Sequence, residues 1–184
     1  MSERNTFVRS LHDLGLAAWF GGSLMGAVGL NGATSEAKDP KERLRLSSDG
    51  WARWVPWEVA AVTAHTIGGI GVIAGNRNRI QKQSGAGAAT VAKFVLTAAA
   101  AGSTAYAGAL GARVKKHEHE GADGAVKPGK KSSPELASAQ QQLRVAQWVT
   151  PVLTGIALIL NALHGEQQRG LPGALDPGGQ RQVS

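Results

Sequence analysis

The chain has 184 residues and no cysteine, which excludes disulfides, thiolate metal sites and a cysteine nucleophile. It is basic, with 20 Lys and Arg against 13 Asp and Glu, but aromatic residues make up only 5% and no nucleic-acid-binding motif is present. Nucleic acid is therefore not an expected partner. Four apolar windows alternate with polar connections, and this local pattern outweighs the mean hydropathy of −0.14.

The first apolar window predicts a helix over residues 9–32, and no charged residue stands between Leu14 and Ser35. At about 1.5 Å per residue, this stretch is long enough to cross a bilayer core of about 30 Å. Small residues recur on one side of the helix: Gly15, Ala18, Gly22, Gly26 and Gly29. The pair Gly22-x-x-x-Gly26 predicts a site where another helix approaches backbone to backbone.

The second window predicts a helix over residues 56–76 that begins at Pro56. Three tryptophans, Trp51, Trp54 and Trp57, precede it at a place that suits the headgroup interface. Further upstream, Asp39-Pro40-Lys41-Glu42 has the residues of a helix start and predicts a separate surface helix of two turns.

Two further helices are expected over residues 92–112 and 134–164, the second bent at Pro151. Between them, residues 113–131 are charged, contain glycine and lack apolar periodicity, which predicts a mobile loop. Residues 166–184 are rich in Gly, Pro and Gln and are expected to form a disordered tail.

These elements predict an all-α integral membrane protein, a four-helix bundle in up-down-up-down order over residues 1–165. An even number of spans places both termini on one side of the cell membrane. The short loop between the second and third helices carries Arg77, Arg79 and Lys82 and no acid, which favours cytoplasmic termini.

His12 and Trp19 share one face of the first helix with the glycines. The pattern His-x6-Trp-x-Gly-Gly, formed by His12, Trp19, Gly21 and Gly22, resembles the first helix of a loose group of four-helix or larger membrane proteins. That group includes the copper-resistance D proteins, related uncharacterised membrane proteins and the haem-binding protoporphyrinogen oxidases of bacteria. The resemblance covers about twenty residues and would imply copper or haem chemistry.

His65, near the middle of the second helix, is either a haem or metal ligand or proton relay, or a packing histidine bonded across a helix interface. Glu58 precedes it by two turns on the same face. The expected helix ends place His65 and His12 about 15 Å apart in depth at 1.5 Å per residue. One haem is therefore not expected to bind both histidines.

The last helix carries a polar stripe at spacings of three, four and seven, formed by Gln147, Thr150, Thr154 and Asn161. Such a stripe hydrogen-bonds neighbouring helices or, alternatively, lines a substrate path. His164, at the end of this helix, lies on the same side of the membrane as His12. The two are either a pair that includes Asp13 or, as favoured, two interfacial histidines bound to water or headgroups. The run from His117 to Glu120 is expected to be solvated rather than a metal site.

No nucleophile–base pair, phosphate loop or zinc spacing is present, so an enzyme is not expected. The leading hypothesis is a structural or accessory subunit that packs against itself or a larger membrane complex within the lipid bilayer. The alternative is a haem- or metal-binding redox or metal-handling protein that uses His65 or His12. A transporter or channel subunit is a weaker alternative.

Overall fold

The computed structural model describes residues 3–75 and 86–168, and the side chains of residues 6–75 and 90–163. All regular elements within these ranges are helices. Four of the helices are long and apolar enough, by length and composition, to cross a membrane. The prediction of an all-α fold with four long apolar helices is confirmed.

The first of these helices is a continuous rod made of three segments. Helix α1 (Glu3–Met25) is followed by one stretch of π-helix, η1 (Gly26–Leu30), and by α2 (Asn31–Ser35). The residues at both junctions keep right-handed helical dihedral angles, so the chain does not turn between the segments. The rod begins six residues before the predicted start.

Helix α3 (Pro40–Gly75) starts where the sequence predicts a short surface helix, and the Asp39 side chain accepts a hydrogen bond from the Lys41 N–H at 2.9 Å. It then continues through Pro56 without ending. The prediction that a new helix begins at Pro56 is wrong. A proline removes one backbone hydrogen bond, and helices held by their neighbours, as membrane helices are, tolerate that loss.

The second half of the chain contains α5 (Ala86–Lys116) and α6 (Pro134–Gln168). The Ser133 side chain caps α6 by accepting a hydrogen bond from the Leu136 N–H at 3.2 Å. Pro151 lies inside this helix, as Pro56 does in α3. From residue 169 on, the predicted disordered tail lies outside the described residues.

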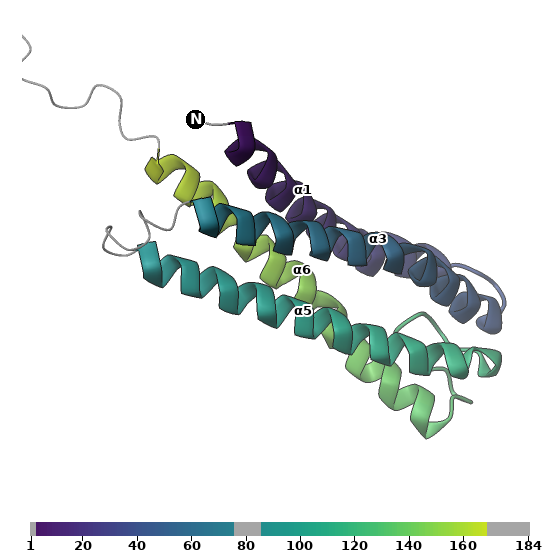
Figure 1. Cartoon of the computed structure of the whole chain (residues 1–184). Coiled ribbons are helices and arrows are strands. Elements are labelled where there is room, and N and C mark those ends of the chain that lie inside the picture. Colours follow the sequence, from purple (N-terminus) through teal and green to yellow (C-terminus); the bar gives the residue numbers. More distant parts are fainter. Residues whose placement is uncertain (1–2, 76–85, 169–184) are drawn as a thin grey trace, which may run out of the picture.

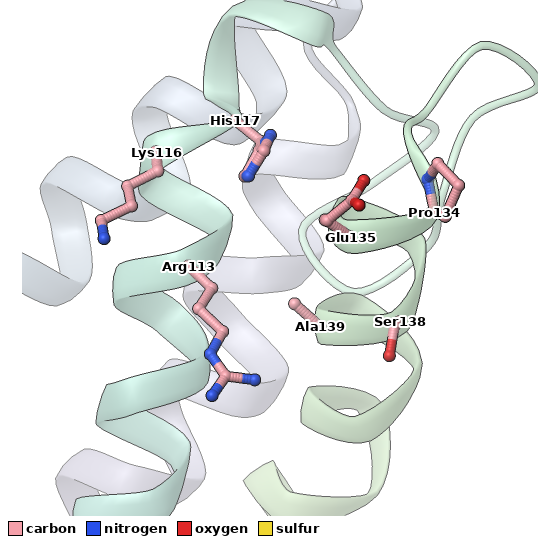
Figure 2. A pocket seen from close by; sticks show the side chains of 7 residues that line it. All are labelled: Arg113, Lys116, His117, Pro134, Glu135, Ser138 and Ala139. Atoms are coloured by element: carbon pink, nitrogen blue, oxygen red, sulfur yellow. The ribbon is translucent and has the colours of Figure 1, made fainter.

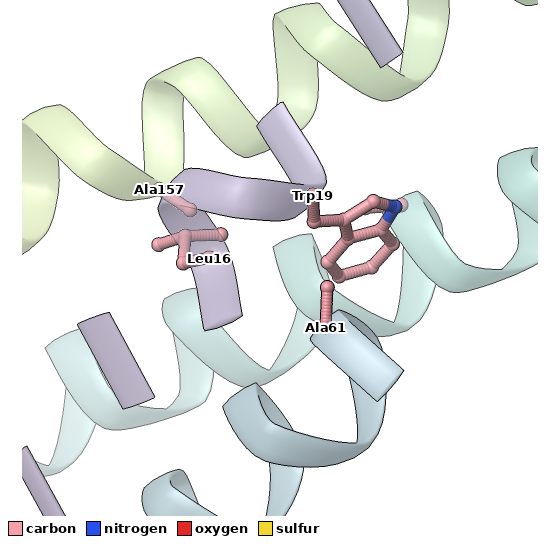
Figure 3. Packing of buried hydrophobic residues seen from close by; sticks show 5 residues of the cluster. Leu16, Trp19, Ala61 and Ala157 are labelled. Carbon is pink, nitrogen blue, oxygen red and sulfur yellow. The ribbon is translucent and has the colours of Figure 1, made fainter. Parts of the chain in front are cut away.

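Figure 1 shows α1 alongside α3 and α5 alongside α6. Helix α1 also packs on α6, where the Phe20 ring covers Gly155. All four helices supply the buried apolar cluster in the middle of the bundle, which consists of Leu16, Trp19, Ala61, Ala100 and Ala157. Figure 3 shows four of these side chains converging between the helices.

A second apolar cluster lies at the end of the bundle where α3 and α6 begin and α5 ends. It consists of Leu44, Val114, Ala122, Leu136 and Ala139. Ala122 belongs to the segment that joins α5 to α6, and that segment contains the 3₁₀-helix η2 (Glu118–Glu120). We call residues 40–47 and 114–143 the cap.

Hydrogen bonds of its backbone hold the segment between α5 and α6 against the starts of α3 and α6. The Ala122 N–H donates to the Pro40 carbonyl at 3.1 Å. The buried Gln140 side chain donates to the carbonyls of Gly124 at 2.8 Å and Ala125 at 3.0 Å. The prediction of a mobile loop over residues 113–131 is therefore wrong, because its small residues let the backbone lie close to the ends of α3 and α6.

Candidate functional site

A close approach of the α1 and α3 backbones brings His12 and His65 together. A Cβ atom on Gly15 would lie 2.5 Å from the His65 backbone nitrogen, and one on Gly68 would lie 2.4 Å from the His12 backbone nitrogen. Only glycine leaves room for such an approach. The two imidazole rings stack between the helices with centroids 4.0 Å apart and an interplanar angle of 20°.

The two histidines bond each other's backbone. His12 Nδ1 lies 2.9 Å from the His65 carbonyl oxygen, and His65 Nδ1 lies 3.1 Å from the His12 carbonyl oxygen. Because a carbonyl can only accept, both Nδ1 atoms carry the proton and donate. In a neutral ring the Nε2 atom is then an acceptor.

Both Nε2 atoms meet a donor. Thr97 Oγ1 of α5 lies 3.2 Å from His65 Nε2, and Asn161 Nδ2 of α6 lies 3.4 Å from His12 Nε2. All four ring nitrogens are therefore engaged within the chain. The histidine pair connects all four helices at one level of the bundle.

The predicted depth difference of about 15 Å between the two histidines is wrong. His12 lies nine residues after the start of α1 at Glu3, and His65 lies ten residues before the end of α3 at Gly75. In two antiparallel helices these positions are level. The error came from placing the start of the first helix at residue 9.

The arrangement does not fit a haem or metal ion held by this pair. The ring faces are stacked on each other, and each Nε2 lone pair is directed at a different side-chain donor, Thr97 or Asn161. The described residues also contain no group of three or more His, Cys, Asp or Glu side chains that could hold a metal ion.

A second polar layer surrounds Trp19, whose side chain is fully buried. Its Nε1–H donates to Thr104 Oγ1 at 3.1 Å, and Thr104 lies 3.3 Å from Thr150 Oγ1. Thr150 in turn donates to Ser103 at 3.1 Å. This layer connects α1, α5 and α6.

A third layer is centred on Asn31, which we did not single out from the sequence. Asn31 Nδ2 donates to Gln147 Oε1 at 2.9 Å. Its Oδ1 accepts hydrogen bonds from Ser47 Oγ and Trp51 Nε1, both at 3.0 Å. The sequence contained one signal for this layer: Asn31 is an amide in an otherwise apolar run. Such a side chain needs hydrogen-bond partners once it is buried.

The polar stripe of α6 is divided between these layers. Gln147, Thr150 and Asn161 hydrogen-bond other helices, as described above. Thr154 is buried and donates to the Thr150 carbonyl of its own helix at 2.8 Å. The His164 side chain lies outside the described ones.

Gly22 and Gly26 do not meet another backbone. A Cβ atom on Gly22 would lie 1.8 Å from the Trp54 ring, and one on Gly26 would lie 2.2 Å from the Trp51 ring. These glycines make room for indole rings of α3, and the backbone contact predicted for them occurs instead at Gly15. Of the three tryptophans Trp51, Trp54 and Trp57, only Trp57 is exposed, with 69% of its surface accessible.

The acidic and histidine run in the cap has a structural role. The Glu120 carboxylate accepts hydrogen bonds from the Ser133 N–H at 2.7 Å and from His117 Nδ1 at 2.7 Å. These two hydrogen bonds hold the pKa of Glu120 below its ordinary value. The run is thus tied to the start of α6 rather than simply solvated.

The chain matches no family model, and no curated protein or solved structure matches it either.

Proposed function

We propose that the chain is a multi-pass membrane protein that acts as a structural or accessory subunit, with no catalytic activity of its own. In this proposal the four helices cross the cell membrane in up-down-up-down order. Their outer surface packs against a second copy or against a larger membrane complex. The observation that carries the proposal is an exposed stripe of small residues on α5.

This stripe follows a spacing of three and four residues, which places its members on one face of the helix. Its small residues are all exposed: Ala98, Gly102, Ala105, Ala109 and Ala112. The exposed Val91 and Val95 continue the same face toward the start of α5. A Cβ atom on Gly102 would meet nothing within 4 Å. Small residues let helix backbones approach closely in a bilayer, so this face suits another helix better than lipid chains.

The interior of the bundle supports the same proposal. The polar side chains of the three layers around His65, Trp19 and Asn31 form hydrogen bonds between helices. Groups engaged in this way hold helices together, whereas a substrate path would need polar groups that face open space. A packing role therefore accounts for both the inside and the outside of the bundle.

The test is the size of the protein purified in a mild detergent, measured by light scattering and by cross-linking in membranes. Gly102→Leu places a branched side chain on the proposed contact face and should reduce association. Gly21→Leu is the matched control, because a Cβ atom there also meets nothing within 4 Å but lies on α1. Equal association of both variants and the wild type would contradict the proposal.

An absorption spectrum of the same preparation tests the cofactor alternative. We expect no Soret band, because all four nitrogens of the histidine pair have partners within the chain. A Soret band that corresponds to one haem per chain and disappears in His65→Ala would contradict the proposed structural role and support a haem-binding protein.

A further inference from the structure

Two depressions follow each other along the seam between α5 and α6. The first lies at the cap, has a volume of about 540 Å³, and is lined by Arg113, Lys116, His117, Glu135 and Ser138 among others. The second has a volume of about 610 Å³ and is lined mainly by apolar atoms, including those of Tyr106, Val145 and Val149.

The depressions lie on the same side of the seam. Tyr106 and Arg113 are seven residues apart on α5, and Gln142 and Glu135 are seven residues apart on α6, so each pair shares a helix face. Seven residues correspond to about 10 Å along a helix. The Tyr106 hydroxyl donates to Gln142 Oε1, and both residues line the second depression.

We propose that this seam binds one anionic phospholipid, with the phosphate at Arg113 and Lys116 and an acyl chain along Val145 and Val149. The apolar stretch of α6 starts at Val145, directly after Arg144. The Tyr106–Gln142 hydrogen bond therefore lies at the membrane interface, where tyrosine is favoured. The basic depression comes next on the water side, at the level of the headgroups.

The orientation of Arg113 fits this depth. Side chains on a helix lean toward its N-terminus, which for α5 is the direction of the bilayer. Figure 2 shows the Arg113 guanidinium below its own Cα atom, in the gap between α5 and α6. From there it can offer a planar pair of N–H groups to a phosphate.

The charges at the seam favour an anion. Neither Arg113 nor Lys116 forms an ion pair with any described residue. Glu135 is the acid of this depression, and Figure 2 shows its carboxylate across the gap at the level of His117, away from the Arg113 guanidinium. A soluble anion would need only the basic depression, whereas the adjoining apolar one suits an acyl chain.

The experiment is a titration of the full-length protein, purified in detergent, with phosphatidylglycerol, and the bound lipid is counted by native mass spectrometry. Phosphatidylcholine with the same acyl chains and glycerol 3-phosphate are the two comparison ligands. We expect one phosphatidylglycerol per chain, weaker binding of phosphatidylcholine, and no competition by glycerol 3-phosphate at matched concentration.

The variants Arg113→Gln and Lys116→Gln should each weaken phosphatidylglycerol binding roughly fivefold, the effect of one basic group near a membrane surface. Lys115→Gln removes the same charge from the same helix turn outside the depression and should have little effect. Arg113 is exposed, so its variant should keep the thermal midpoint of the lipid-free protein. Equal binding of both lipids, equal loss in all three variants, or full competition by glycerol 3-phosphate would each overturn the proposal.

Discussion

Glycine has two distinct uses along α1 and η1. At Gly15 it lets the α3 backbone approach, and the neighbouring histidines can then bond each other's carbonyl groups. At Gly22 and Gly26 it makes room for the rings of Trp54 and Trp51. The first contact involves two rigid backbones, so an added atom there cannot be absorbed by a side-chain rotation.

Gly15→Ala should therefore lower the thermal midpoint of the protein in detergent, with a cost of about 1–3 kcal/mol for overpacking. Gly68→Ala should behave in the same way, because its Cβ would meet the His12 backbone. Gly21→Ala is the control, since nothing lies within 4 Å of that position. Equal midpoints for all three variants would show that the close contact of α1 and α3 does not stabilise the protein.

The residues of this contact could be predicted only in part. The sequence placed Gly15, Trp19, Gly22 and Gly26 on one face of the first helix, and each of them faces other parts of the bundle. It did not show which partner each one meets, because the tryptophans before Pro56 also fit the membrane interface. The histidine pair was missed because it depends on the register of two helices.

At the scale of elements, the cap departs most from expectation. The segment between α5 and α6 lacks apolar periodicity, so the sequence predicted mobility. The segment is ordered by hydrogen bonds with residues distant in the sequence. The Ala122 N–H donates to the Pro40 carbonyl, and the Gln140 side chain donates to two backbone carbonyls of the segment. Local composition cannot reveal hydrogen bonds of this kind. The helix starts at Pro40 and Pro134 were predictable, because proline is favoured at the first position of a helix.

Glu120 should make the cap sensitive to acid. Its pKa is lowered from the ordinary 4.5, first by the hydrogen bond from the Ser133 N–H and then by that from His117. A carboxyl group with a lowered pKa contributes stability above its ordinary pKa, and this contribution is lost as the pH falls through the folded-state value. The cap should therefore loosen as the pH drops below 4.5.

The measurement is amide hydrogen exchange of residues 121–132, corrected for the intrinsic effect of pH. Glu120→Gln cannot change its charge, so its exchange should be faster than that of the wild type near neutral pH and should change less on acidification. Glu42→Gln removes a carboxylate of the same cap whose one ion pair among the described residues is with exposed Arg45, and it should retain the wild-type pH dependence. An unchanged pH response in Glu120→Gln would show that this carboxylate does not hold the segment.

At the scale of the whole molecule, the basic residues are divided between the two ends of the bundle. In the sequence, twelve of the 20 Lys and Arg residues fall within residues 38–53 and 113–144, and the other eight fall within residues 4–9, 77–93 and 169–181. The rule that basic residues stay in the cytoplasm is defined for short loops next to the spans. Much of the basic charge at the end opposite the termini belongs to the folded cap and not to a short loop. The short basic connection between α3 and α5 is therefore the better guide to which side is cytoplasmic.

We therefore predict that a reporter fused after Ser184 is cytoplasmic and that one inserted between Gln81 and Gly87 is cytoplasmic as well. Four spans place both sites on one side of the membrane, and the basic residues Arg77, Arg79 and Lys82 favour the inside for it. A reporter inserted after Lys127 in the cap should read as external. If the first two reporters lie on opposite sides of the membrane, the number of spans is wrong. If all three reporters give the reverse of the expected side, the four spans hold but the orientation of the protein in the membrane is the opposite one.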